Sequence, residues 1–132
     1  MVLRAIYLNT GLKNRHSQSI HAYCIRDMNT FCGFCLLKQY SQKEGYKFTY
    51  EITIYLKPSH MSKGIGGLAI KHLEEIAKTN GIKTIVAGIC SENIESLRLF
   101  EKNHYEKCGH MKNMVYKFDK MLDNIYYQKQ FS

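Results

Sequence analysis

The sequence has one proline and no long hydrophobic run among its 132 residues. A membrane-spanning helix needs about 20 consecutive apolar residues, so we expect no membrane span. The first twenty residues lack the apolar core of a signal peptide, which predicts a cytoplasmic protein. A single proline beside ten tyrosines indicates continuous strands and helices, not a proline-rich linker. An apolar fraction of 45% excludes a disordered tail protein and predicts one domain over residues 1–132.

Acidic residues are also few, with 11 against 19 lysines and arginines, for a net charge of +8. Such a balance favours an anionic partner. The basic residues are scattered and match no nucleic-acid-binding motif, so we expect neither nucleic acid nor a membrane as partner. Five cysteines, an odd number, indicate reduced thiols. Cys32 and Cys35 have the spacing of a redox or metal pair, but they also fit a strand with small side chains. The six histidines show no metal-ligand spacing, so we expect no metal.

Strand and helix patterns alternate after a poorly defined segment at residues 1–19. Short β-rich runs at 20–26 and 31–40 predict a hairpin. The longest strand is expected over residues 46–56, where aromatic and β-branched residues alternate, and Pro58 ends it. An amphipathic helix follows, with Ile65, Leu68, Ala69, Leu73, Ile76 and Ala77 on one face. A strand within 82–89, a helix over 93–102 and two strands around Val115 and Ile125 complete an α/β fold with helices on a mixed sheet.

A glycine-rich loop lies where the longest strand gives way to the helix: Ser62, Lys63, Gly64, Ile65, Gly66 and Gly67. Glycines let the backbone approach a ligand, and the first amides of a helix attract anions. The spacing matches neither the usual phosphate loop nor the dinucleotide fingerprint. The loop therefore predicts an anion site of another type, and the alternative is an ordinary flexible loop before a helix.

This loop resembles the signature of the GNAT superfamily of N-acetyltransferases, in which Gly-x-Gly opens a helix after a long strand. The resemblance implies that residues 62–67 wrap the pyrophosphate of acetyl-CoA. Met61 stands where the family usually has Arg or Gln. A second stretch, residues 91–105, resembles the Asn-x-x-Ser-x-x-Leu-Tyr-Glu-Lys-x-Gly-Phe block of the same family. It implies that Asn93 and Lys102 contact the cofactor, while Asn93 also suits a helix N-cap.

Residues 46–56 are similar to a strand of phosphinothricin acetyltransferases and related L-amino acid N-acyltransferases, as are residues 116–123. This branch implies transfer of an acetyl group from acetyl-CoA to the amine of an amino acid or a similar small molecule. It implies Glu51 as the general base, where the alternative is a solvated or ion-paired strand residue. It implies that the backbone of Ile54, Tyr55 and Leu56 holds the acetyl and pantetheine arm. Phe100 replaces the tyrosine that serves many members as general acid.

The chain is short for this family, which bears on whether the acceptor pocket is complete. The resemblance spans residues 23–129, so we expect the family's first strand and first helix, which help to form the acceptor pocket, to be missing or reduced to residues 1–19. The alternative function is therefore a shortened, catalytically weak or inactive relative that binds CoA or a protein partner. The branch also implies a homodimer, for which Tyr126, Tyr127 and Phe131 offer apolar surface. Cys90 beside the cofactor segment is interpreted as an incidental thiol and not a nucleophile.

Overall fold

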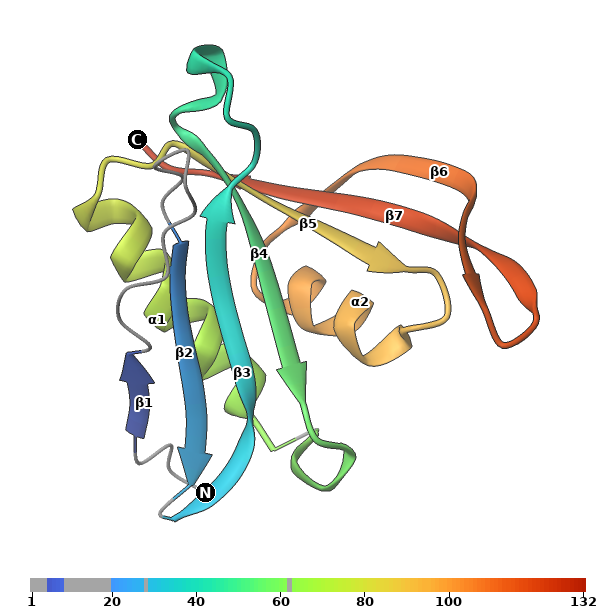
Figure 1. Cartoon of the computed structure of the whole chain (residues 1–132), viewed down its shortest axis with the longest axis horizontal. Coiled ribbons are helices and arrows are strands. Elements are labelled where there is room, and N and C mark those ends of the chain that lie inside the picture. Colours follow the sequence, from blue (N-terminus) through green and yellow to red (C-terminus); the bar gives the residue numbers. More distant parts are fainter. Residues whose placement is uncertain (1–4, 9–19, 28, 62) are drawn as a thin grey trace.

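The computed structural model describes residues 5–8, 20–27, 29–61 and 63–132. Seven strands in this part of the chain form one sheet in the order β1-β2-β3-β4-β5-β7-β6, and only the β4–β5 pair is parallel. The predicted mixed, mostly antiparallel α/β architecture is confirmed (Figure 1). The elements are β1 (Ala5–Leu8), β2 (Ile20–Asp27), β3 (Thr30–Gln39), β4 (Thr49–Leu56), α1 (Ile65–Thr79), β5 (Thr84–Cys90), α2 (Ile94–Lys102), β6 (Glu106–Lys117) and β7 (Lys120–Gln130).

A short strand, β1, lies at the edge of the sheet beside β2. β1 has four residues and pairs antiparallel with β2, with Ala5 opposite Arg26 and Leu8 opposite Tyr23. A first helix, which we expected to be missing or reduced within residues 1–19, would fall in the stretch 9–19, outside the described residues. The β2–β3 hairpin matches its prediction to within a residue at each end.

β4 begins at Thr49, so the prediction of a strand from residue 46 was wrong at its start. Glu44–Tyr46 form a short 3-10 helix, and Lys47 is ion-paired with Glu44 at 2.9 Å. The aromatic side chains of Tyr46 and Phe48 are 42% and 49% exposed. Tyr46 and Phe48 continue the alternating pattern of the strand in the sequence, but they belong to a surface loop that precedes β4.

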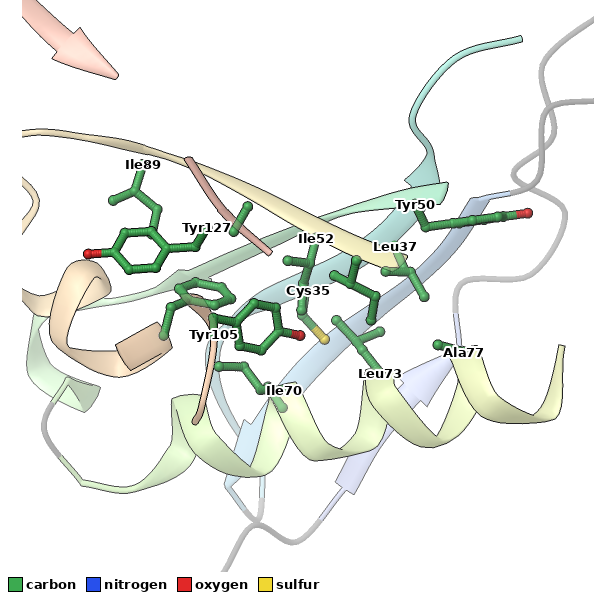
Figure 2. Packing of buried hydrophobic residues seen from close by; sticks show 14 of the residues in the cluster. Cys35, Leu37, Tyr50, Ile52, Ile70, Leu73, Ala77, Ile89, Tyr105 and Tyr127 are labelled. Carbon is green, nitrogen blue, oxygen red and sulfur yellow. The ribbon is translucent and has the colours of Figure 1, made fainter. Parts of the chain in front are cut away.

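The core lies between the sheet and the two helices. Ile70, Leu73 and Ala77 of α1 are fully buried, and Figure 2 shows them beneath the side chains of β3 and β4. Leu68, expected on the buried face, is 39% exposed because its position on α1 turns it away from the sheet. Phe100 of α2 joins the same buried cluster, so both helices share one core. Neither of them, within the described residues, is long and apolar enough to cross a membrane.

β4 and β5 separate soon after they meet. Their parallel ladder contains three residue pairs, from Thr49–Thr84 to Glu51–Val86. Beyond Glu51 the remaining residues of β4 pair with β3 alone, while β5 continues along β7. Figure 1 shows the two strands diverging from this point. The backbone edge of residues 52–56 is therefore left without a strand partner, and the sheet opens there.

The last two strands form a long hairpin whose tip is apolar and exposed. Tyr127, expected to offer apolar surface for a dimer, is only 3% exposed, and Phe131 packs against the core. The part of Tyr127 in that surface was wrongly predicted, because the inward face of β7 alternates with its outward face and Tyr127 falls on the inward one. Tyr126 and Phe131 are half-buried. The large exposed apolar side chains of the hairpin are Met111, Met114, Tyr116, Phe118 and Met121.

Candidate functional site

A cleft of about 750 Å³ opens where β4 parts from β5. Its volume falls within the range of about 300–1,000 Å³ that is typical of ligand pockets. One wall is the end of β4, the second is the first half of α1, and the third is α2 with its C-terminal cap. Residues of these three walls that line the cleft are Ile54, Tyr55, Leu56, Gly64, Gly66, Gly67, Leu68, Lys71, Glu74, Asn93, Glu95, Ser96, Arg98, Leu99, Lys102 and Asn103, with Met61, His104 and Lys129 beside them.

The N-terminus of α1 opens onto this cleft through a glycine cap. Gly64 has a left-handed backbone, with φ of 80°, and a β carbon there would meet no atom within 4 Å. Its carbonyl oxygen accepts a hydrogen bond from the Leu68 amide at 3.3 Å. The preceding amides of the first turn have no partner within the helix, and the first turn carries no acidic side chain. The helix dipole adds positive potential at this end, so the loop fits a phosphate group.

Two further glycines set how closely the walls approach. A β carbon on Gly66 would lie 2.8 Å from Leu99 Cδ2 and 3.5 Å from Leu56 Cδ1. The first turn of α1 is thus packed against both α2 and the end of β4. A β carbon on Gly67 would lie 3.7 Å from the side-chain nitrogen of Asn103, the C-cap of α2. The N-terminus of one helix therefore faces the C-terminus of the other across the cleft.

Asn93 occupies the opposite end of α2. Its side-chain oxygen accepts a hydrogen bond from the Ser96 amide at 3.2 Å, so it caps the helix as predicted. The backbone amide of Asn93 donates to the Cys90 carbonyl at 2.9 Å, which connects the helix start to the end of β5. The cap engages the oxygen, and the side-chain nitrogen of Asn93 is a further donor for a ligand in the cleft.

A buried ion pair lies deep in the cleft. Lys129 of β7 donates to both carboxylate oxygens of Glu74, at 3.1 and 3.3 Å, and to the Asn103 carbonyl at 3.0 Å. Glu74 is only 7% exposed. The neighbouring Tyr105 hydroxyl is buried without a hydrogen-bond partner among the described residues. Burial, with the Glu74 carboxylate nearby, raises the pKa of Tyr105 well above its ordinary value, so this phenol stays neutral.

Glu51 stands at the apex of the split and not in the cleft wall. It is the last β4 residue that pairs with β5. Its neighbours Tyr50 and Ile52 are buried in the core, so the Glu51 side chain points to the other face of the sheet. There its carboxylate lies 3.7 Å from the Lys38 ammonium, with 32% of the side chain exposed. Further along the same face the Phe34 and Tyr55 rings are stacked, with centroids 5.4 Å apart.

The cleft brings together eight of the predicted site residues: Ile54, Tyr55, Leu56, Gly64, Gly66, Gly67, Asn93 and Lys102. Four others are placed differently. Lys63 is exposed outside the lining, Ile65 is buried beneath it with 1% exposure, and Glu51 faces the other side of the sheet. Ser62 lies outside the described residues.

Sequence reasoning overlooked Lys71, Arg98, Asn103 and the Glu74–Lys129 pair. Lys71 could have been found, because it follows Gly67 by four residues and so shares its face of α1. Arg98 precedes Lys102 by the same interval on α2. Nothing in the sequence pairs Lys129 with Glu74, because they are 55 residues apart and meet only through the tertiary fold.

Two of the five cysteines are buried, and the other three are partly or fully exposed. Cys32 and Cys35 are both buried in β3, as the strand interpretation predicted, and burial raises the pKa of Cys35 to about 12. All five cysteines are free thiols. Within the part of the chain that the structure describes, no cluster of three or more potential metal ligands occurs.

The profile of the acetyltransferase (GNAT) family matches residues 3–105. This match begins well before residue 23, where the resemblance in the sequence was placed.

Curated relatives include the L-methionine sulfoximine/L-methionine sulfone acetyltransferase of Salmonella typhimurium, which is 30% identical over 98 residues, or 74% of this chain and 57% of that protein. The phosphinothricin N-acetyltransferase of Streptomyces viridochromogenes is 28% identical over 75% of this chain and 54% of its own length. The chain thus spans little more than half the length of these two relatives.

Among solved structures, the yncA protein of Salmonella typhimurium, determined with its cofactor acetyl-CoA, superposes with a TM-score of 0.79 and 26% identity. The match covers 84% of this chain and 64% of that one.

Proposed function

Because the chain belongs to the acetyltransferase (GNAT) family, we propose that it transfers the acetyl group of acetyl-CoA to the amine of an amino acid or a similar small molecule. The observation that carries this proposal is the meeting of two features at one cleft. The edge of β4 loses its strand partner after Glu51, and the glycine-capped N-terminus of α1 faces the same opening. Acetyl-CoA matches both features, because its extended thioester arm suits the open edge of β4 and its pyrophosphate suits the N-terminus of α1.

The chain's residues fit the donor on geometric grounds. Open space above Gly64 and the unpaired first-turn amides of α1 suit the pyrophosphate. The pantetheine arm would lie along Ile54, Tyr55 and Leu56 of β4, with Asn93 on the facing wall. A main-chain amide of this segment donates to the acetyl carbonyl oxygen as negative charge develops on it, which a fixed backbone donor stabilises without reorganisation.

Transfer also needs a neutral amine. We assign to Glu51 the role of general base, accepting a proton from the acceptor ammonium directly or through one water. The amine nitrogen then bonds to the carbonyl carbon, the carbon–sulfur bond breaks, and the CoA sulfur leaves as a thiolate that is protonated afterwards. Approach from the face that carries Glu51 keeps the acceptor opposite the donor. On this face the Lys38 ammonium lies 3.7 Å from the Glu51 carboxylate.

The acceptor class rests on the relatives, which are named for amino-acid-like substrates. A cytoplasmic location and a homodimer belong to the same proposal. The exposed apolar side chains at the tip of the β6–β7 hairpin, and not Tyr127, are the apolar surface available to a second copy.

A thiol-release assay with acetyl-CoA and a panel of L-amino acids, methionine sulfoximine and phosphinothricin tests the function. We expect release of CoA thiol with at least one acceptor and an N-acetylated product by mass spectrometry. Calorimetry with CoA is run beside it. Cofactor binding without thiol release for any amine would contradict the enzyme and leave a CoA-binding protein, whereas failure of both would contradict the donor site itself.

A further inference from the structure

We infer that Lys71 and Lys102 form a second phosphate subsite that makes this chain discriminate CoA from 3′-dephospho-CoA. The inference rests on the proposed function and deepens it. It concerns the second anionic group of the donor, the phosphate monoester on its ribose, which the glycine loop cannot serve while it holds the pyrophosphate.

The two lysines are placed around the point where the helices meet. Lys71 follows Gly67 by one turn of α1, so both lie on the same side of the helix. Lys102 directly precedes Asn103, whose side-chain nitrogen would lie 3.7 Å from a β carbon on Gly67. Both lysines line the cleft, one from each wall. The cleft therefore offers a phosphate one lysine from each of two walls.

Among the described residues, neither lysine forms an ion pair, whereas five other lysines do. Ion pairs among the described residues engage Lys38, Lys47, Lys78, Lys120 and Lys129. Lys71 and Lys102 form no ion pair with a described carboxylate, although both are exposed and Glu74 is close along α1. Glu74 is instead neutralised by Lys129. Three cations without an ion pair among the described residues thus line the cleft: Lys71, Lys102 and Arg98, which lies one turn before Lys102 on α2.

A phosphate monoester carries more negative charge than either phosphate of the pyrophosphate, and bonds between charged groups are about twice as strong as neutral ones. Because both lysines are exposed and form no ion pair with a described residue, neither has to break an existing ion pair to bind this phosphate. The expected signature is a preference for CoA over 3′-dephospho-CoA that weakens as salt is added, since exposed charges are screened.

Calorimetric titration of the full chain with CoA and with 3′-dephospho-CoA tests this inference. We expect the intact chain to bind CoA about tenfold or more tightly than 3′-dephospho-CoA. The double variant K71A/K102A should bind both ligands with similar affinity, close to that of the intact chain for 3′-dephospho-CoA. That retained affinity also shows that the variant is folded.

The matched control is K43A/K107A, which removes the same two charges from exposed positions outside the cleft. It should keep the preference for CoA. Equal binding of the two ligands by the intact chain would overturn the subsite while leaving the proposed function in place. Loss of the preference in the control would assign it to net charge and also overturn the subsite. Failure of the intact chain to bind either ligand would contradict the proposed function.

Discussion

The backbone of Gly33 lies so close to Tyr55 that a β carbon on Gly33 would be 1.9 Å from the Tyr55 carbonyl oxygen. No side-chain rotation relieves such a contact, because both partners are backbone. Gly33 is paired with Leu56 next to the β2–β3 bulge that leaves Cys32 without a partner. The close approach fixes the end of β4, and this segment forms a wall of the cleft.

Gly33→Ala is therefore expected to destabilise the fold by about 2–3 kcal/mol, as overpacking of a core does. Urea and thermal denaturation measure this loss. Gly45→Ala is the control, because a β carbon there meets nothing within 4 Å, and its effect should stay within about 0.5 kcal/mol. Equal stability of the two variants would show that β3 and β4 can separate at Gly33 without cost.

Gly64 and Gly81 flank α1, and both have left-handed backbones, with φ of 80° and 71°. Replacing either by Ala should cost about 1 kcal/mol of stability, because an L side chain is strained there. Only Gly64→Ala should also weaken acetyl-CoA binding, since only Gly64 lines the cleft. Denaturation and calorimetry on the pair separate the two effects. Similar affinity in both variants would argue against pyrophosphate at the α1 cap.

Glu51→Gln tests the proposed base while keeping the shape of the side chain. We expect kcat to fall by about 100-fold or more, with little change in the affinity for acetyl-CoA. Glu44→Gln removes a paired carboxylate from a surface loop and should leave kcat unchanged. An unchanged kcat in Glu51→Gln would place the base elsewhere.

Lys129→Met would leave Glu74 buried without its ion-pair partner, with its side chain only 10% exposed. Removal of one member of a buried pair typically costs about 3–5 kcal/mol, so a loss near the lower limit is expected. Lys78→Met breaks an exposed pair with Glu75 and should cost less than about 1 kcal/mol. Denaturation of both variants at pH 7 compares them. If the two losses match, Glu74 must be reached by solvent.

The Asp123 side chain of β7 connects this strand to β6. Its carboxylate lies 2.7 Å from His110 Nε2 and accepts a hydrogen bond from the Asn113 amide at 3.0 Å. The hydrogen bond to His110, followed by that from the Asn113 backbone, lowers the pKa of Asp123 below 3.8. A lowered pKa stabilises the fold above the unfolded value, and this contribution is lost as pH falls through the folded value.

Asp123→Asn should therefore lower Tm at pH 6–7, and the difference from the parent should shrink below pH 4. Thermal melts over this pH range measure it. Asp119→Asn is the control on the same hairpin, because Asn tolerates the left-handed backbone found at that position. A Tm difference that persists at pH 2–3 would assign the role of Asp123 to its shape and not to its charge.

The sequence was most informative where local patterns decide the structure. The Asn93 cap, the α1 and α2 helices and the β2–β3 hairpin depend on residues close in sequence, and their bounds were predicted nearly correctly. The start of β4 was misplaced because alternating aromatics indicate a strand whether or not a neighbouring strand pairs with them. Exposure of Leu68 and burial of Tyr127 could not be read from periodicity, since each depends on which element packs beside it.

The site divides in the same way. The glycine loop was recognisable, because strained backbone and helix caps need particular residue types. Lys102 was named from the resemblance and Lys71 was overlooked, but that the two line one cleft follows only from the packing of Gly67 against Asn103. Glu51 was named from a resemblance, yet its place at the last β4–β5 pair follows from sheet register alone.

Three residue pairs join the two halves of the sheet. Few backbone hydrogen bonds therefore connect strands β1 to β4 with strands β5 to β7, and the core beneath the sheet provides most of the contact between the two groups. A molecule bound along residues 52–56 would contact both halves and stabilise their arrangement. Amide hydrogen exchange along the end of β4 should slow on binding by more than it does in the β2–β3 hairpin, so that the donor becomes part of the structure that holds the sheet closed.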